Sequence, residues 1–253
     1  MAQETHQERN ISDLIPRIAY WIRDWFSKNG GENAIVGISG GKDSSVVAAL
    51  CAQALGKDHV VGVIMPNLHQ SDIDDSYYLC DTLGIRRYTV PVTMPVVDTL
   101  NQLFNSDIRV SDQAYINLPA RIRMATLYAV SQSMNGRVAN TCNLSEDWIG
   151  WSTRWGDSVG DFCPIAMLTA TEVVEIGRHL GLPARLIDKP PADGLTGNSD
   201  EDNFGFSYEV LDRYIRTGVC DSQRAREKID QLHQKNAFKL HMPDAFDPYC
   251  SVK

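Results

Sequence analysis

The sequence predicts an α/β protein, a single domain built on a parallel, doubly wound sheet flanked by helices. Short apolar, strand-like runs alternate with helix-like segments from about residue 34 onward. The connections between them are short, and a glycine-rich turn joins the first strand to the next helix. Because the carboxyl ends of parallel strands share one edge of the sheet, we expect the ligand-binding residues at that edge.

The individual elements follow from periodicity and turn residues. Residues 11–28 carry apolar side chains at three-to-four spacing and stop at a Gly-Gly pair, which indicates an N-terminal helix over 11–29. The strands expected next are 34–39, 60–65, 87–90 and 137–141, and the helices between and after them are 44–55, 71–83, 118–134 and 171–180. A Pro-, Gly- and Asp-rich segment, about 188–203, precedes closing helices at 208–215 and 223–234, within a helical region of about 207–240.

The bulk composition is that of a globular, cytoplasmic protein. A chain of 253 residues suffices for one large domain over 1–253. Its net charge of −8 indicates no basic surface, so we expect no nucleic-acid partner. No segment approaches the roughly 20 apolar residues that span a bilayer, and no signal segment opens the chain, so we expect no membrane association. The six cysteines form no C-x-x-C pair and are expected to be reduced packing thiols.

The run 37–45, Gly-Ile-Ser-Gly-Gly-Lys-Asp-Ser-Ser, carries the clearest functional signal. Gly40 and Gly41 let the backbone approach a polyphosphate, and the amides of the following helix attract it. The Walker pattern fails, because Val36 stands at its first glycine and Asp43 at its Ser/Thr. A carboxylate at that place suits a magnesium ion. A glycine-rich turn without a ligand is the alternative, but it leaves the polar residues of the run unexplained.

This run resembles the PP-loop of the ATP pyrophosphatases, whose sheet is of the Rossmann-like, adenine nucleotide alpha hydrolase type. Further motifs make the chain similar to the ammonia-dependent NAD synthase family, in that family's order: 117–124, 143–146, 155–161, and 189–195 with 200–202. The resemblance implies a ligase in which the carboxylate of deamido-NAD attacks the α-phosphate of ATP. Ammonia then displaces AMP from the adenylated intermediate, and the products are NAD, AMP and pyrophosphate.

The resemblance also implies the partners. Nothing in the chain resembles a glutamine-hydrolysing domain, so free ammonia is the expected nitrogen donor, and supply by a separate glutaminase stays open. Members of the family are homodimers with deamido-NAD bound at the subunit interface. We therefore expect a homodimer, and the aromatic helices at 20–26 and 128–134 are candidates for its surface.

The family motifs assign roles to the ATP and metal site. Asp43 and Glu146, from two separate strand ends, are expected to hold Mg²⁺, and Asp43, Lys42 and Asp161 are the expected catalytic residues. Without the family, Glu146 would be a solvated acid in the first turn of a helix capped by Ser145. The positions expected to bind ATP are Gly37, Ser39, Gly40, Gly41, Lys42, Ser44, Gln70 and Thr141, of which the last two could be polar loop residues.

A second set of positions matches the deamido-NAD site of the family. Arg121 is a planar donor suited to phosphate or carboxylate, while Arg123 should face elsewhere on the same helix. The matching positions are Arg121, Arg154, Asp157, Asp161, Phe238 and Lys239. Asp157 could instead cap a turn. The segment 188–203 resembles a loop that orders over bound substrates, although its composition alone indicates only a surface loop.

Several positions depart from the family pattern. Ala170 replaces a lysine that reaches the ATP phosphates, and Ala192 replaces a Ser/Thr that contacts ATP. Asn140 and Cys142 replace glycines, and Leu144 replaces a lysine. We hypothesise that the lysine at position 42 supplies the missing charge.

Two other functions stay open. One is a catalytically weakened protein that binds a nucleotide or NAD precursor, which the lost residues favour and the retained pair Asp43 and Glu146 opposes. The other is a different PP-loop enzyme, such as a tRNA-modifying one, which the acidic charge and the scattered cysteines oppose.

Overall fold

The computed structural model describes residues 10–68, 70, 72–189, 200–243 and 245–246. Within them, four parallel strands form a sheet in the order β3-β2-β1-β4. The strands are β1 (Asn33–Gly37), β2 (Val60–Ile64), β3 (Arg86–Thr89) and β4 (Gly136–Ala139). The chain winds from β1 outward to β3 and then returns to place β4 on the other side of β1. This confirms the predicted parallel, doubly wound α/β class.

Helices cover both faces of the sheet, which is why the central strands are apolar throughout. Alternate side chains of β1 divide between the two faces. Ala34 and Val36 pack with residues of α1 (Ile11–Asn29), α2 (Lys42–Leu55), α3 (Ile73–Leu83), α7 (Ala170–His179) and α8 (Ala184–Ile187). Ile35 packs on the opposite face, where Leu127 of α5 (Asp112–Ser133) covers β1, β2 and β4.

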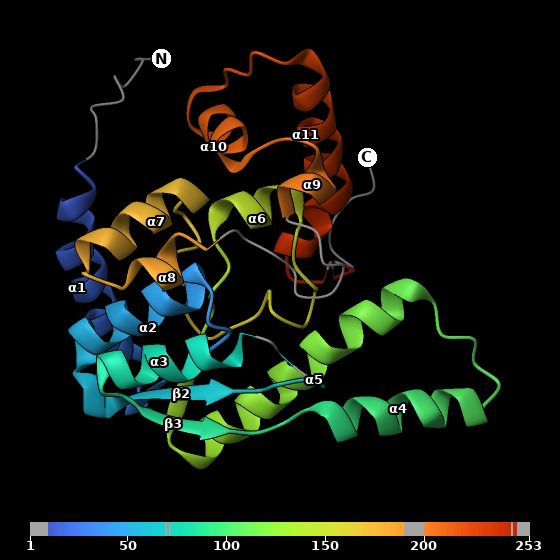
Figure 1. Ribbon diagram of the computed structural model, residues 1–253, viewed down its shortest axis with the longest axis horizontal. Helices are drawn as coiled ribbons and strands as arrows, with labels where there is room; N and C mark the ends of the chain where they lie inside the picture. The colour runs from blue at the N-terminus through green and yellow to red at the C-terminus, as the bar shows by residue number, and fades with distance from the viewer. Residues whose placement is uncertain (1–9, 69, 71, 190–199, 244, 247–253) are drawn as a thin grey trace.

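Two further groups of helices lie beyond the layers that cover the sheet (Figure 1). The first comprises α6 (Leu144–Ile149), α9 (Asp200–Phe204), α10 (Tyr208–Thr217) and α11 (Gln223–Asn236), which share a hydrophobic cluster centred on Leu211 and Ile229. Short 3-10 turns lie at Lys57–His59 and Ala237–Leu240. The second group is α4 (Thr93–Asn105) with the first half of α5, which reach out beyond the sheet.

Most predicted elements are present with small shifts at their ends. The N-terminal helix is confirmed, with Asn10 as its cap. Three expectations were wrong in detail: α2 begins at Lys42 instead of 44, α5 begins at Asp112 instead of 118, and residues 200–203 lie in α9 instead of a loop. Helix α4 was not predicted. The rest of the expected loop, including Ala192, lies largely outside the described residues.

The described cysteines are all free. Cys51, Cys80 and Cys142 are buried, as expected of packing thiols, whereas Cys163 is exposed and Cys220 is half-buried. Cys250 lies outside the described residues. Of the helices that the structure describes, none combines the length and apolar character that crossing a membrane requires.

Candidate active site

The phosphate loop follows β1 and leads directly into α2. Gly40 adopts a left-handed conformation (φ 82°), and Gly41 is the N-cap of α2. Ser39 in the loop and Ser44 in the first turn of α2 fix the loop's shape, because Ser39 Oγ lies 3.0 Å from Ser44 Oγ and accepts a hydrogen bond of 3.2 Å from the Gly41 amide. A Cβ at residue 40 would lie only 3.0 Å from Cβ of Asp75, so glycine is required there.

The first turn of α2 holds an ion pair beside this loop. Lys42 is buried, and its Nζ lies 2.6 Å from Oδ2 of Asp43. The same ammonium lies 5.6 Å from the ring centroid of Tyr208 on α10. The second carboxylate oxygen of Asp43, Oδ1, accepts a 3.0 Å hydrogen bond from Nδ2 of Asn143. The loop after β1 is thereby joined to the loop after β4.

Asn143 also caps the short helix α6 that carries Glu146. Its Oδ1 accepts hydrogen bonds from the amides of Ser145 (3.0 Å) and Glu146 (3.1 Å). In return, Glu146 Oε2 accepts a 3.2 Å hydrogen bond from the Asn143 amide, which completes a capping box. The expectation that Ser145 caps this helix was therefore wrong. Ser145 is buried, and its hydroxyl donates to the carboxylate of Asp212 on α10.

The two predicted metal ligands thus share one neighbour, because Asn143 donates to the Asp43 carboxylate through its side-chain amide and to the Glu146 carboxylate through its backbone amide. Burial and then the negative charge of Asp43 raise the pKa of Glu146 well above its ordinary value, while the charge of Lys42 lowers it. Two carboxylates and an ammonium therefore lie together at the carboxyl ends of β1 and β4, where the strand order reverses.

The other predicted ATP-binding residues lie around this centre. Gln70 Nε2 donates to the Ser39 carbonyl oxygen at 3.4 Å, so Gln70 contacts the phosphate loop. Thr141 follows β4 and is half-buried. Its neighbours Asn140 and Cys142 are two of the positions that depart from the family pattern. Both contact the loop that contains Asp157, because Asn140 Nδ2 and Cys142 Sγ donate to the carbonyl oxygen of Asp157.

A second cluster joins loop 150–157 to the C-terminal turn. The guanidinium of Arg154 lies 5.0 Å from the ring centroid of Trp155 and 5.1 Å from that of Phe238. Arg121 Nε donates to the Arg154 carbonyl oxygen at 3.3 Å. Lys239 Nζ donates to the carbonyl oxygens of Gly150 (2.8 Å) and Ser152 (3.1 Å). The structure therefore brings Arg121, Arg154, Phe238 and Lys239 together.

The two remaining acids have structural partners. Asp157 Oδ1 accepts a 2.8 Å hydrogen bond from the Thr153 amide, so it does cap a turn, and its charge also acts on Lys239. Asp161 lies at the outer edge of β4, where its carboxylate accepts hydrogen bonds from the Val138 amide (2.7 Å) and the Tyr128 hydroxyl (3.3 Å). Its contacts are with the sheet edge and not with the phosphate loop.

Comparison with known proteins identifies the family. The model of the NAD synthase family matches residues 14–243. The chain belongs to the NAD synthase family. It is 36% identical to the NH(3)-dependent NAD(+) synthetase of Pyrococcus furiosus over 87% of this chain and 83% of the relative. It is also 36% identical to the enzyme of the same name from Pyrococcus horikoshii, over 91% and 92% of the two chains.

Solved structures agree with this assignment. The NMN synthetase from Francisella tularensis superposes with a TM-score of 0.88 at 29% identity, over 96% of this chain and all of that one. The NH3-dependent NAD synthetase from Campylobacter jejuni gives a TM-score of 0.77 at 25% identity, over 94% and 99%. This NAD synthase family member therefore shares its fold with an NMN synthetase and an NAD synthetase.

The residues present fit a magnesium ion. Mg²⁺ is typically bound by one or two carboxylates together with substrate phosphates and water. Asp43 and Glu146 supply such a pair, and a bound cation would offset the charge of Asp43, which adds to the effect of burial in raising the pKa of Glu146. In the described part of the chain, no group of three or more His, Cys, Asp or Glu side chains forms a self-sufficient metal site.

Asn143 is the residue of this site that sequence reasoning missed. The signal was present, because Asn-x-x-Glu at 143–146 has the spacing of a capping box. Its bond to Asp43 could not be read from the sequence, since it depends on β4 lying beside β1.

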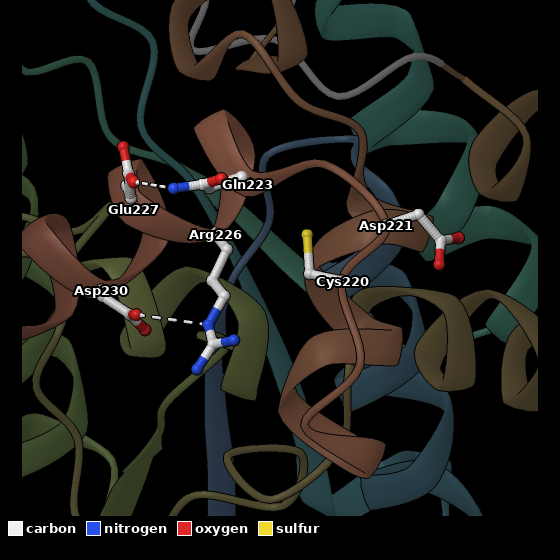
Figure 2. Close-up of a pocket in the computed structure, with 6 residues that line it drawn as sticks. All are labelled: Cys220, Asp221, Gln223, Arg226, Glu227 and Asp230. Carbon is white, nitrogen blue, oxygen red and sulfur yellow. Dashed lines mark hydrogen bonds and ion pairs between the residues drawn. The ribbon is translucent and has the colours of Figure 1, made fainter.

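A pocket of about 460 Å³ lies elsewhere, where the turn after α10 meets α11 (Figure 2). Gln223 donates to Glu227 at 2.8 Å, and Arg226 Nε lies 3.9 Å from Oδ2 of Asp230. These pairs are exposed and the lining includes no predicted site residue, so we assign this pocket no role in the family's chemistry.

Proposed function

We propose that this protein is a ligase that uses ATP and ammonia to convert deamido-NAD to NAD, through an adenylated intermediate, with release of AMP and pyrophosphate. One observation carries the proposal above the others. Asp43 and Glu146, supplied by the loops after β1 and β4, are held together by Asn143 beside a glycine-rich phosphate loop.

The proposed chemistry needs a carboxylate to become part of a good leaving group. The amides of the loop 37–44 and the N-terminus of α2 hold the ATP phosphates, and the ammonium of Lys42 contributes positive charge beside them. A magnesium ion held by Asp43 and Glu146 would supply Lewis-acid neutralisation of the phosphate oxygens. The nicotinate carboxylate then attacks the α-phosphate, and ammonia attacks the activated acyl carbon.

The second cluster is the proposed site for deamido-NAD. Arg154 and Arg121 supply planar cationic donors, and Phe238 and Trp155 supply exposed aromatic faces. Within the described chain, the buried Nε of Arg154 and the buried hydroxyl of Ser152 have no hydrogen-bond partner, which leaves two polar atoms for a substrate. We retain Asp157, Asp161 and Lys239 as proposed contributors, although the hydrogen bonds described above join them to the protein itself.

We also propose that the protein is a homodimer and that α4 with the first half of α5 forms its interface. These helices and the connection between them expose large apolar side chains: Met94, Val97, Phe104, Ile108, Tyr115 and Ile116. The helix at 20–26 exposes Tyr20 and Trp21 but buries Phe26 in the core. A charged residue at position 104 should give monomers in size-exclusion chromatography with light scattering.

We place the dimer in the cytoplasm, where free cysteines are usual.

The decisive assay supplies purified protein with ATP, Mg²⁺, ammonium and deamido-NAD. We expect NAD, AMP and pyrophosphate in equal amounts, and a strong loss of turnover in the variants Glu146→Gln and Lys42→Gln. Nucleotide binding without NAD formation would instead support a binding protein and overturn the proposal. Full activity of Lys42→Gln would refute the role of that ammonium.

A second candidate is amidation of nicotinate mononucleotide to NMN. It is favoured by the TM-score of 0.88 to the NMN synthetase from Francisella tularensis, against 0.77 for the NAD synthetase from Campylobacter jejuni. The same assay separates the two candidates when kcat/KM is measured with each acid. A higher value for the mononucleotide would assign the protein to NMN synthesis.

A further inference from the structure

The first turn of α3 lies against the phosphate loop. A Cβ on Gly40 would be 3.0 Å from Cβ of Asp75 and 3.1 Å from the backbone nitrogen of Ser76. Ser76 Oγ donates to the Ile38 carbonyl oxygen at 3.3 Å, and Gln70 contacts the carbonyl of the next residue of the loop. The start of α3 thus forms one wall of the phosphate site.

Two cationic side chains, Arg185 and Lys189, bind the acidic residues at the start of α3. Arg185 Nε donates to Asp75 Oδ1 at 3.0 Å, and its guanidinium lies 4.3 Å from the ring centroid of Tyr78. Lys189 Nζ donates to Asp72 and, at 3.2 Å, to Asp75 Oδ2. Because Asp75 leaves no room for a side chain on Gly40 and also binds Lys189, this one side chain lies between the ammonium and the phosphate loop.

Lys189 is held by ion pairs that are open to solvent. Its side chain is 32% exposed and that of its partner Asp72 is 39% exposed. Ion pairs with this exposure contribute little to stability, so their partners exchange easily. Burial lowers the pKa of Lys189, but the hydrogen bonds from its ammonium to Asp72 and Asp75 outweigh this and raise it, so the side chain stays charged. A polyphosphate carries more negative charge than a single carboxylate, so it can compete with an exposed carboxylate for an ammonium.

We propose that Lys189 is a further phosphate-binding residue, which leaves Asp72 and contacts the polyphosphate of ATP when the nucleotide occupies the loop. Asp75 keeps the ammonium beside the loop while Asp72 competes for it. This inference rests on the ATP site of the proposed function. It adds a cation from the segment after α8 to the one already supplied by α2.

The test measures binding of α,β-methylene-ATP, which cannot be cleaved between its α and β phosphates, by calorimetry with Mg²⁺. Lys189→Ala should raise Kd about tenfold, the equivalent of losing one charge-assisted hydrogen bond. Lys189→Arg should stay near wild type. Asp72→Asn should lower Kd, because it releases Lys189, and the gain should disappear in the double variant. Asp72 makes no cap hydrogen bond to α3, so the amide leaves the helix intact.

A purely structural ion pair would respond differently, because breaking it from either side should change Kd in the same direction. Effects of equal sign in Lys189→Ala and Asp72→Asn, or unchanged binding in Lys189→Ala, would overturn the inference. Arg178→Ala is the matched control, since it breaks the neighbouring Arg178–Asp188 pair without touching α3, and it should leave Kd unchanged. Absence of binding to the wild type would reject the ATP site itself, and with it the proposed function.

Discussion

Replacing Asn143 should lower the thermal stability of the protein and raise the Mg²⁺ concentration that NAD formation requires. Both effects are expected because this one side chain caps α6 and binds Asp43. Asn143→Ala removes the cap of α6, which is worth about 1 kcal/mol. It also removes a hydrogen bond to the carboxylate of Asp43, worth about 1.5–3 kcal/mol. The sum is about 2.5–4 kcal/mol. For a chain of this size, each kcal/mol lowers Tm by roughly 2–4 °C, so we expect a fall of roughly 5–15 °C.

Two matched variants separate these contributions. Asn143→Ser keeps a capping side chain but is too short to bond Asp43 from the same position. It should recover the share of Tm due to the cap, while half-maximal NAD formation still requires more Mg²⁺ than in wild type. Asn143→Asp keeps the cap but adds a third carboxylate beside Asp43 and Glu146, and turnover should fall further. Thermal melts and magnesium titrations of initial rate measure both effects. Wild-type Tm and magnesium dependence in Asn143→Ala would refute this account.

Three further changes have expected outcomes. Gly40→Ala places a Cβ 3.0 Å from Asp75 in a left-handed conformation, so the KM for ATP should rise at least about tenfold in steady-state assays; an unchanged KM would contradict the loop geometry. Phe162→Ala removes a ring packed 5.0 Å from Trp25 and should lower the free energy of unfolding by about 3–5 kcal/mol in urea titrations, whereas a loss below about 1 kcal/mol would contradict the packing. Burial raises the pKa of both Cys163 and Cys142, but only Cys163 is exposed, so iodoacetamide should modify Cys163 well before Cys142, and mass spectrometry of peptides would show the reverse order if this is wrong.

The sheet was predictable from sequence because β1, β2 and β4 are largely buried apolar runs bounded by turn residues, and the exposed edge strand β3 follows from the alternation of strands and helices. Each observed strand lies within a residue or two of its expected range. Helix α4 escaped prediction, since Val96 is its only fully buried residue and its apolar pattern faces no core. The start of α5 was placed too late because Pro119 is typical of a first helical turn, whereas the helix runs through it from a cap at Ser111.

The site was predictable to the extent that neighbouring strands determine it. Asp43 and Glu146 could be expected together because they follow two strands of one parallel sheet. What surrounds them could not be predicted, because it depends on packing between distant segments. Lys239 illustrates this: the sequence marks it as a cation for a substrate, and only the structure shows its ammonium bonded to the carbonyl oxygens of Gly150 and Ser152.

The order of the strands also determines when the site can form during synthesis. Asp43 and Asn143 are 100 residues apart, and they meet only after β4 has paired with β1. A nascent chain that ends before β4 therefore carries the phosphate loop without its second carboxylate, and one edge of its central strand lacks a partner. On the ribosome, nucleotide and magnesium can stabilise this protein only after more than half of it has been translated.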